Sequence, residues 1–173
     1  MKNYAVRNPQ TGKLVWISRS MAVVAIIKVT KEDENYLLCL KRGPGCPDEV
    51  GKYAFCSGYL DYDETRKEAM IREVYEELGL DLNKMNWEII EEEINDDPKD
   101  DPRQNLSTRY FIELDWNKNF EEYLKNLDIK SEDRGGEKNE VSKIELIDPE
   151  KIDKTDWAWN HKELANRVLK LNP

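Results

Sequence analysis

The stretch GYLDYDETRKEAMIREVYEELGL, which runs from Gly58 to Leu80, decides the fold. Within it, Thr65 and Glu68 have the spacing of a capping box, in which each side chain bonds the backbone N–H of the other residue. Gly79 stands where a helix commonly ends on a left-handed residue. These signals predict a helix over about residues 66–78.

One face of this predicted helix is apolar and the opposite face is acidic. The apolar stripe consists of Met70, Ile71, Val74, Tyr75 and Leu78. Glu73, Glu76 and Glu77 fall together on the other side. Like charges at these spacings cost roughly 0.2–0.5 kcal/mol per pair, and acids in the last turn oppose the helix dipole. The acidic face therefore works against the helix that carries it.

Two interpretations fit this acidic cluster. The first is a solvated acidic face, which is common in a chain with 36 acidic residues. The second is a metal platform, because Mg²⁺ prefers oxygen ligands and usually binds a few carboxylates together with substrate phosphates. A hard cation would remove the repulsion, so the charge conflict favours the metal platform.

The same stretch resembles the signature of the Nudix hydrolase family, G-x5-E-x7-R-E-U-x-E-E-x-G-U, in which U is apolar. Its specified positions are filled by Gly58, Glu64, Arg72, Glu73, Val74, Glu76, Glu77, Gly79 and Leu80. A chance match at the seven fixed identities is on the order of 10⁻⁹ per window. The resemblance implies an α/β fold, the Nudix-type α/β/α sandwich with a mixed β-sheet. It also implies a pyrophosphohydrolase that uses Mg²⁺ or Mn²⁺ to cut a phosphoanhydride bond.

The resemblance assigns roles to residues of the signature. Glu73, Glu76 and Glu77 would be metal ligands, and Glu73 is also a candidate base for the attacking water. Glu64 and Arg72 would hold the helix and the preceding loop in place.

Residues on either side of the signature complete the implied site. The main-chain carbonyl of Ser57 would be a further metal ligand, and Glu137 or Glu140 would add a base or ligand from downstream. Either downstream acid could instead be an ordinary surface residue. The loop departs from the family pattern, because Cys56 and Ser57 replace Pro-Gly before the first glycine and Asp63 replaces a glycine.

Periodic segments predict the remaining elements. Strands are expected over residues 14–18, 22–29, 35–42, 87–94, 107–116 and 140–147. A short helix is expected over residues 120–127 and an amphipathic closing helix over residues 159–171. The polar segment 130–139 predicts a mobile loop. No internal repeat or linker interrupts the pattern, so we expect one domain over residues 1–173.

Composition narrows the partners and the compartment. The net charge of −9 and pI near 4.9 disfavour polyanionic partners. Three cysteines without a C-x-x-C pair indicate a reducing compartment rather than a disulfide framework. The sequence has neither an apolar run near the ~18 residues of a membrane span nor a signal-peptide core. We therefore expect a cytoplasmic protein without a membrane partner.

Several side chains are candidates for binding the rest of a substrate. Lys41, Arg42 and Arg109 could bind phosphates. A base could stack on Tyr53, Phe55, Trp157 or Trp159, although aromatic residues beside strands commonly belong to the core. For His161, capping or packing is favoured over catalysis.

The resemblance implies a small nucleotide substrate, namely a nucleotide sugar, ADP-ribose, a dinucleotide or a nucleoside triphosphate. One alternative is an RNA 5′-end pyrophosphohydrolase, the single nucleic-acid partner retained despite the net negative charge. Another is a Nudix-fold sensor that binds a nucleotide without cutting it. The family commonly forms homodimers, so a second copy of the chain is a further implied partner.

Overall fold

The computed structural model describes residues 3–99, 103 and 105–171 of the chain. The strands are β1 Tyr4–Arg7, β2 Leu14–Ile17, β3 Met21–Lys31, β4 Glu34–Arg42, β5 Tyr53–Ala54, β6 Cys56–Tyr59, β7 Trp87–Asn95, β8 Leu106–Asp115 and β9 Val141–Ile147. The α-helices are α1 Arg66–Leu78, α2 Lys118–Lys125 and α3 His161–Val168. Three 3₁₀ turns accompany them: η1 Leu82–Lys84, η2 Ser131–Arg134 and η3 Pro149–Lys154. All predicted strands and helices are present, with ends that shift by a few residues.

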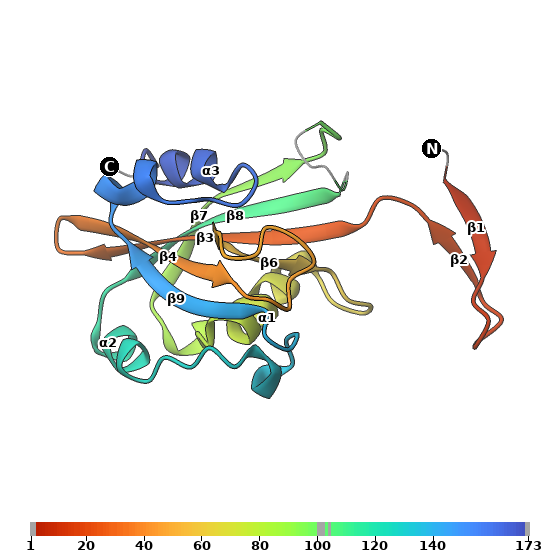
Figure 1. Cartoon of the computed structure of the whole chain (residues 1–173), viewed down its shortest axis with the longest axis horizontal. Coiled ribbons are helices and arrows are strands. Elements are labelled where there is room, and N and C mark those ends of the chain that lie inside the picture. The colour runs from red at the N-terminus through yellow and green to blue at the C-terminus, as the bar shows by residue number, and fades with distance from the viewer. Residues whose placement is uncertain (1–2, 100–102, 104, 172–173) are drawn as a thin grey trace.

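Seven strands form one mixed sheet with helices on both faces (Figure 1). The strand order is β5-β4-β3-β8-β7, while β6 pairs with β3 and β9 pairs with β4. The β3–β8 pair is parallel and the other pairs are antiparallel. The predicted α/β/α sandwich with a mixed sheet is confirmed. Among the described helices, none is long and apolar enough to cross a membrane.

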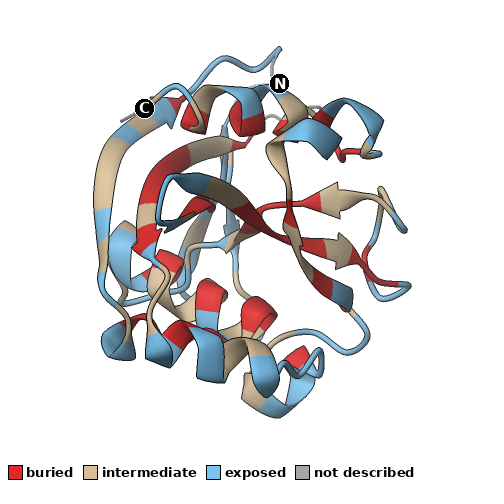
Figure 2. Cartoon of the chain, turned by 90° about the vertical axis from the view of Figure 1, so that its left-hand side faces the viewer, coloured by how far each residue is buried: buried red, intermediate tan, exposed pale blue. Residues whose placement is uncertain are grey.

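The central strand β3 is apolar on both faces because helices cover both. Val23, Ala25 and Ile27 belong to the core cluster that contains residues of α1 and α2. Val24 and Ile26 alternate with them and belong to the cluster on the side of α3. Figure 2 shows this pattern as buried stretches along the strands and on the helix sides that face them.

Helix α1 has the ends that the sequence predicted. The Thr65 hydroxyl accepts from the Glu68 amide at 3.3 Å, and the Glu68 carboxylate accepts from the Thr65 amide at 2.7 Å. At the other end, Gly79 adopts φ 66° and its amide donates to the Tyr75 carbonyl at 2.9 Å. Local capping chemistry therefore fixes the length of the helix.

The predicted buried stripe of α1 is wrong at one position. Tyr75 is 46% exposed although it was placed on that stripe. On the opposite, acidic face, Glu77 is only 2% exposed. The reason is β6, which lies against the acidic side of the helix, where the Ser57 amide donates to Glu77 at 2.9 Å. The core therefore covers the apolar face of α1, and β6 covers part of its acidic face.

The expected mobile loop over residues 130–139 instead contains η2, which packs on the end of α1. The last turn of α1 has no basic residue of its own. Arg134 supplies one, because its Nε donates to the carbonyls of Tyr75 at 2.9 Å and Glu76 at 3.1 Å. The guanidinium therefore adds a charged donor at the C-terminal end of the helix, where cations are favourable.

Two short strands, β1 and β2, form a separate hairpin ahead of the main sheet (Figure 1). The sequence predicted β2 but not its partner β1. The single domain over residues 1–173 stays a prediction.

Replacing Arg134 by alanine should lower the free energy of unfolding by about 1–2 kcal/mol, because the C-terminal carbonyls of α1 lose a charged donor. Urea unfolding measures the change. Lys130→Ala is the matched control, since Lys130 makes no side-chain capping bond and is exposed. Equal stability of the two variants would contradict the capping role.

Candidate functional site

The contact between strand β6 and helix α1 depends on Gly58 in β6. A Cβ atom built on Gly58 would lie 2.0 Å from Oε1 of Glu73. The backbone of β6 therefore runs against the carboxylate of Glu73, at a distance that only glycine permits. This contact explains physically why a glycine opens the signature.

Arg72 gathers the acidic side chains of the signature around one guanidinium. It contacts Glu64 through Nε at 3.1 Å and through Nη2 at 2.8 Å. Its Nη1 donates to Glu73 at 2.8 Å and to Glu76 at 3.1 Å. Its Nη2 also donates to the Tyr59 carbonyl at 2.9 Å. These bonds tie the helix, the loop before it and the end of β6 together.

The environment of each carboxylate sets its pKa. Hydrogen bonds from Arg72 lower the pKa of Glu64. Burial, with a smaller contribution from the charge of Glu140, raises the pKa of Glu77 to about 8. Burial also raises the pKa of Glu73 to about 7, against the opposing effect of Arg72. The acidic cluster is therefore short of positive charge, even with Arg72 in place.

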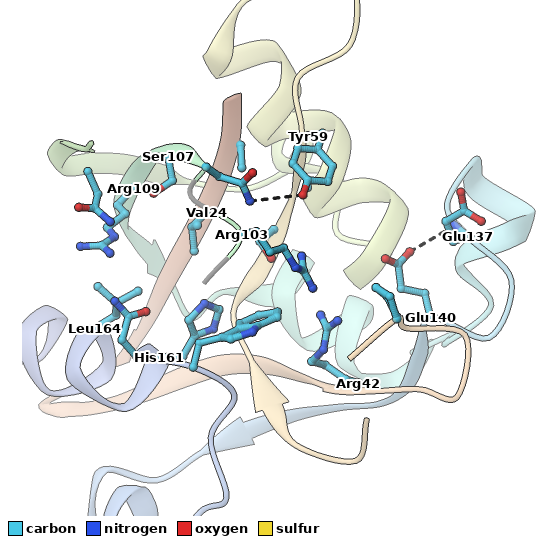
Figure 3. Close-up of a pocket in the computed structure, with 18 of the residues that line it drawn as sticks. Val24, Arg42, Tyr59, Arg103, Ser107, Arg109, Glu137, Glu140, His161 and Leu164 are labelled. Carbon is cyan, nitrogen blue, oxygen red and sulfur yellow. Dashed lines mark hydrogen bonds between the residues drawn. The ribbon is translucent and has the colours of Figure 1, made fainter. Parts of the chain in front are cut away.

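Of the two downstream candidates, the structure brings Glu140 to the cluster. Its charge is among those that raise the pKa of both Glu73 and Glu77. Burial raises the pKa of Glu140 itself. Glu137 is exposed, and its amide donates to the Glu140 carboxylate at 3.3 Å (Figure 3). Glu137 thus positions Glu140 through its backbone.

The donor set suits a hard divalent cation. Within the described residues, no three His, Cys, Asp or Glu side chains converge at metal-ligand distances. Arg72 lies between Glu73 and Glu76 instead, and Glu77 accepts from a backbone amide. The side chains of Glu73, Glu76 and Glu77 offer carboxylate oxygens, and burial, with a smaller contribution from neighbouring carboxylates, raises the pKa values of Glu73 and Glu77, which a bound cation would counter. The residues fit the ion by their chemistry.

The residues that could hold such an ion are Glu73, Glu76 and Glu77, with Glu140 beside them. The ligand role of the Ser57 carbonyl stays a prediction. The neighbouring Cys56 is buried, and burial raises the pKa of its thiol well above the usual range. This agrees with a packed residue rather than a reactive thiol.

A cavity of about 400 Å³ opens between this cluster and α3. Ser57, Gly58 and Glu140 line it on the side of the signature, while Trp159 and Leu164 line it on the side of α3. Figure 3 shows the side chains of Arg42 and Arg103 turned toward one another, with Glu140 to one side. Of the carboxylates near the signature, Glu140 therefore lines the same cavity as the two arginines.

Trp159 and Asp48 organise the arginines in the cavity. The Arg42 guanidinium lies 4.5 Å from the centre of the Trp159 ring, and that of Arg103 lies 5.3 Å from it. Arg42 Nη2 is 3.2 Å from Asp48 Oδ1, and Arg103 pairs with the same carboxylate. Trp159 also has φ 46°, an uncommon conformation for a bulky residue.

Only some of the predicted phosphate-binding residues reach this cavity. Arg42 and Arg109 line it, and Arg109 pairs with Glu93 at 2.9 Å. Lys41 lies over the ring of Tyr53 instead, 5.6 Å from its centre. Arg103 is an addition that the sequence did not reveal, because it sits in a polar segment without periodic pattern.

Among the four aromatic candidates, Trp159 alone lines this cavity. Phe55 and Trp157 pack in the core cluster on the side of α3. Tyr53 donates its hydroxyl proton to Glu145 at 2.6 Å. Phe55 and Trp157 are therefore core residues, as the alternative interpretation predicted.

His161 has the packing role that the sequence favoured. It is 4% exposed, and its Nδ1 accepts from the Phe55 amide at 3.0 Å. Burial, together with the positive charges of Arg42 and Arg109, lowers the pKa of His161 to about 3. The ring is therefore neutral and supports the cavity wall.

This neutral histidine should make stability depend on pH. Because an unfolded histidine has a pKa of about 6.5, protons favour the unfolded chain below that pH, and this loss continues toward pH 3. Between about pH 7 and about pH 5.5, the group alone should remove about 1 kcal/mol from the free energy of unfolding. Urea unfolding at both pH values tests it.

His161→Gln provides the comparison for this pH dependence. Glutamine keeps an oxygen acceptor for the Phe55 amide and does not titrate. Its loss of stability between the two pH values should be smaller by the same ~1 kcal/mol. Parallel pH profiles for the two proteins would show that His161 is not the titrating group.

Known proteins share this fold, and a known family model matches this sequence. The family model of the NUDIX domain matches residues 19–168. Among curated proteins, no sequence matches the chain.

Solved structures do match the chain, at low sequence identity. A mutT/nudix family protein from Listeria innocua has a TM-score of 0.59 at 22% identity, covering 87% of this chain and 91% of that chain. The NUDIX domain of Shewanella oneidensis NrtR, solved with ADP ribose, has a TM-score of 0.60 at 14% identity, covering 94% and 92%.

A bifunctional NMN adenylyltransferase/ADP ribose pyrophosphatase from Francisella tularensis, solved with AMP and a Mn ion, gives a TM-score of 0.60 at 16% identity. The match covers 88% of this chain and 42% of that chain. The TM-scores show a shared fold, and the family model covers most of the sequence. The chain therefore belongs to the Nudix hydrolase family.

Proposed function

We propose that this protein hydrolyses a phosphoanhydride bond in a small nucleotide bound in the cavity beside α1, with Mg²⁺ or Mn²⁺ as cofactor. The observation that carries the proposal is the placement of opposite charges around one cavity. Glu140 lines the cavity on the side of the signature and lies close enough to Glu73 and Glu77 to affect their pKa values, and Arg42 and Arg103 line the same cavity. The negative charge of a diphosphate in this cavity would be balanced by the arginines and by the divalent cation that the carboxylates would hold.

Each wall has a distinct part in this proposal. Glu73, Glu76 and Glu77 would hold the metal, which supplies Lewis-acid activation of the phosphate and of an attacking water. Arg42 and Arg103 would bind phosphate oxygens in exchange for their present partner Asp48. Arg72 would keep Glu73 and Glu76 oriented.

Two carboxylates are candidates for the general base. A base works best when its pKa lies near the working pH. Burial raises the pKa of Glu73 to about 7 and also raises that of Glu140. Glu73 accepts a hydrogen bond from Arg72, whereas Glu140 accepts one from a backbone amide. Both remain in the proposal, and comparing Glu73→Gln with Glu140→Gln separates them.

The rest of the cavity suits a nucleoside. Trp159 offers a ring for a base once an arginine moves from it. Asn95, Asn105 and Ser107 add polar groups to the wall near Arg109. The volume of about 400 Å³ falls in the range of small-molecule sites. The proposed substrate is therefore a nucleoside diphosphate linked to another group.

The related structures support this substrate class. The Shewanella domain was solved with ADP ribose, and the Francisella protein with AMP and a Mn ion. For the present chain, nucleotide sugars, ADP-ribose, dinucleotides and nucleoside triphosphates are the compounds to compare.

In a panel of these nucleotides with Mg²⁺ or Mn²⁺, one compound should be cleaved, as followed by chromatography. Glu76→Gln should lower kcat by about 10²-fold or more, because it removes a proposed metal ligand. Glu122→Gln is the matched control, since Glu122 lies on α2 and away from the cavity. Equal loss in both variants would contradict the role of Glu76.

Two other outcomes would change the proposal. Cleavage confined to RNA 5′ ends would identify the RNA pyrophosphohydrolase. Saturable nucleotide binding in calorimetry, without cleavage of any compound, would identify a sensor rather than an enzyme.

A further inference from the structure

The connection that follows β4 carries two glycines that its backbone angles do not explain. Residues 43–46, the glycine loop, read Gly-Pro-Gly-Cys. Neither Gly43 nor Gly45 has a positive φ, so a left-handed conformation is not the reason for either glycine. The remaining reason for a residue without a side chain is the close approach of another part of the protein.

The part that approaches is residues 138–140, just before β9. A Cβ atom built on Gly43 would lie 2.2 Å from the carbonyl oxygen of Asn139. One built on Gly45 would lie 2.1 Å from the carbonyl oxygen of Lys138. Both distances are shorter than real Cβ contacts, and the obstacle is backbone, which cannot swing aside as a flexible side chain can. The glycine loop therefore packs backbone against backbone on this segment.

Three donors of the glycine loop bond to two carbonyls of the segment. The Gly43 amide donates to the Glu140 carbonyl at 2.6 Å, and the Gly45 amide donates to the Asn139 carbonyl at 2.9 Å. The thiol of Cys46 also donates to the Glu140 carbonyl, at 3.2 Å. Burial raises the pKa of this thiol, so it keeps the proton that it donates. The backbone of Glu140 is therefore fixed from the side of the glycine loop.

A second set of bonds holds the Glu140 side chain from within its own turn. The Glu137 amide donates to the Glu140 carboxylate at 3.3 Å (Figure 3). The Glu137 carbonyl accepts from the hydroxyl of Ser131, a buried residue, at 2.7 Å. Asn139 has φ 58°, in the left-handed region that asparagine tolerates better than most residues. Glu140 is thus held at its backbone by the glycine loop and at its carboxylate by this turn.

Regular sheet pairing does not by itself place Glu140. The register between β4 and β9 shifts near the start of β9, because Lys41 pairs with Lys143 whereas Arg42 pairs with Val141. The ladder is therefore irregular at the end that adjoins Glu140. The bonds of the glycine loop fix the chain at the point where the ladder becomes irregular.

We propose that Gly43, Gly45 and Cys46 are positioning residues, which hold Glu140 in its place beside the acidic cluster. This inference rests on the proposed function, because it concerns how Glu140 is kept ready to serve that reaction. Misplacing a reacting group by about 1 Å can cost about 10²-fold in rate, so the support of its backbone matters. Gly43 and Cys46 are not among the residues that line the cavity, and their effect on the reaction therefore passes through Glu140.

Substitutions can loosen the glycine loop one contact at a time. Gly43→Ala places a methyl group against the Asn139 carbonyl and should lower kcat by about 10- to 100-fold, with little change in KM. Cys46→Ala removes a donor and should have a smaller effect, whereas Cys46→Ser keeps a donor and should lie closer to the wild type. Pro44→Ala is the matched control, since Pro44 lies between the glycines, is exposed and does not line the cavity.

The Glu140→Gln background separates positioning from a merely structural role. If the glycine loop acts through Glu140, Gly43→Ala should lower kcat much less in Glu140→Gln than in the wild type, because the group that it displaces is already lost. A loop that only stabilises the fold would cost the same fraction of activity in both backgrounds, and that result would overturn the inference. Cys46→Ala takes the place of Gly43→Ala in this comparison if the alanine at residue 43 prevents folding.

Hydrogen exchange followed by mass spectrometry tests the contact without any reaction. The amides of residues 137–141 should exchange faster in Gly43→Ala or Cys46→Ala than in the wild type, and Pro44→Ala should match the wild type. Unchanged exchange in the first two variants would overturn the inference even if the protein cleaves a nucleotide. Faster exchange in a protein that cleaves no nucleotide would support the holding of Glu140 and contradict the proposed function instead.

Discussion

The guanidinium of Arg72 is the interaction on which the acidic side of α1 depends. It bonds to Glu64, Glu73 and Glu76, and to the carbonyl of Tyr59. One cation therefore joins three carboxylates from the loop and the helix to the end of β6. One positive charge does not balance the group, because Glu77 lies buried on the same side. The helix tolerates its acids through Arg72, and the remaining imbalance leaves the site suited to a further cation.

Burial of Glu77 shows how the fold and the site constrain one another. A solvated glutamate would cost the helix little, whereas a buried carboxylate is costly unless it is hydrogen-bonded. Here the amide of Ser57 provides a bond, and Gly58 lets β6 come close enough to provide it. The close approach of β6 to α1 therefore has two effects. It gives Glu77 a hydrogen bond, and it crowds the carboxylates of the helix. Breaking a local rule of helix stability at one place is typical of a functional site.

Sequence patterns predicted the elements that local chemistry determines. The ends of α1 depend on residues within one turn of Thr65 and Gly79, so their signals could be read directly. The burial of Glu77 depends on β6, a four-residue strand without a periodic signal, and this is why the sequence did not predict it. Arg103 reaches the cavity through tertiary contacts with Asp48 and Trp159, which no local pattern encodes.

The arginines of the cavity already have anionic partners, and this bears on what the cavity can select. Arg42 and Arg103 share Asp48, while Arg109 pairs with Glu93. A neutral ligand in the cavity would have to displace these carboxylates from the arginines without supplying a negative charge of its own. A phosphate can exchange for Asp48. Two of its oxygens can accept hydrogen bonds from one planar guanidinium, and this bidentate geometry favours the exchange. In the proposed function, these ion pairs would therefore favour phosphorylated ligands over neutral ones. The carboxylates beside the cavity would then favour ligands whose phosphates arrive with a divalent cation.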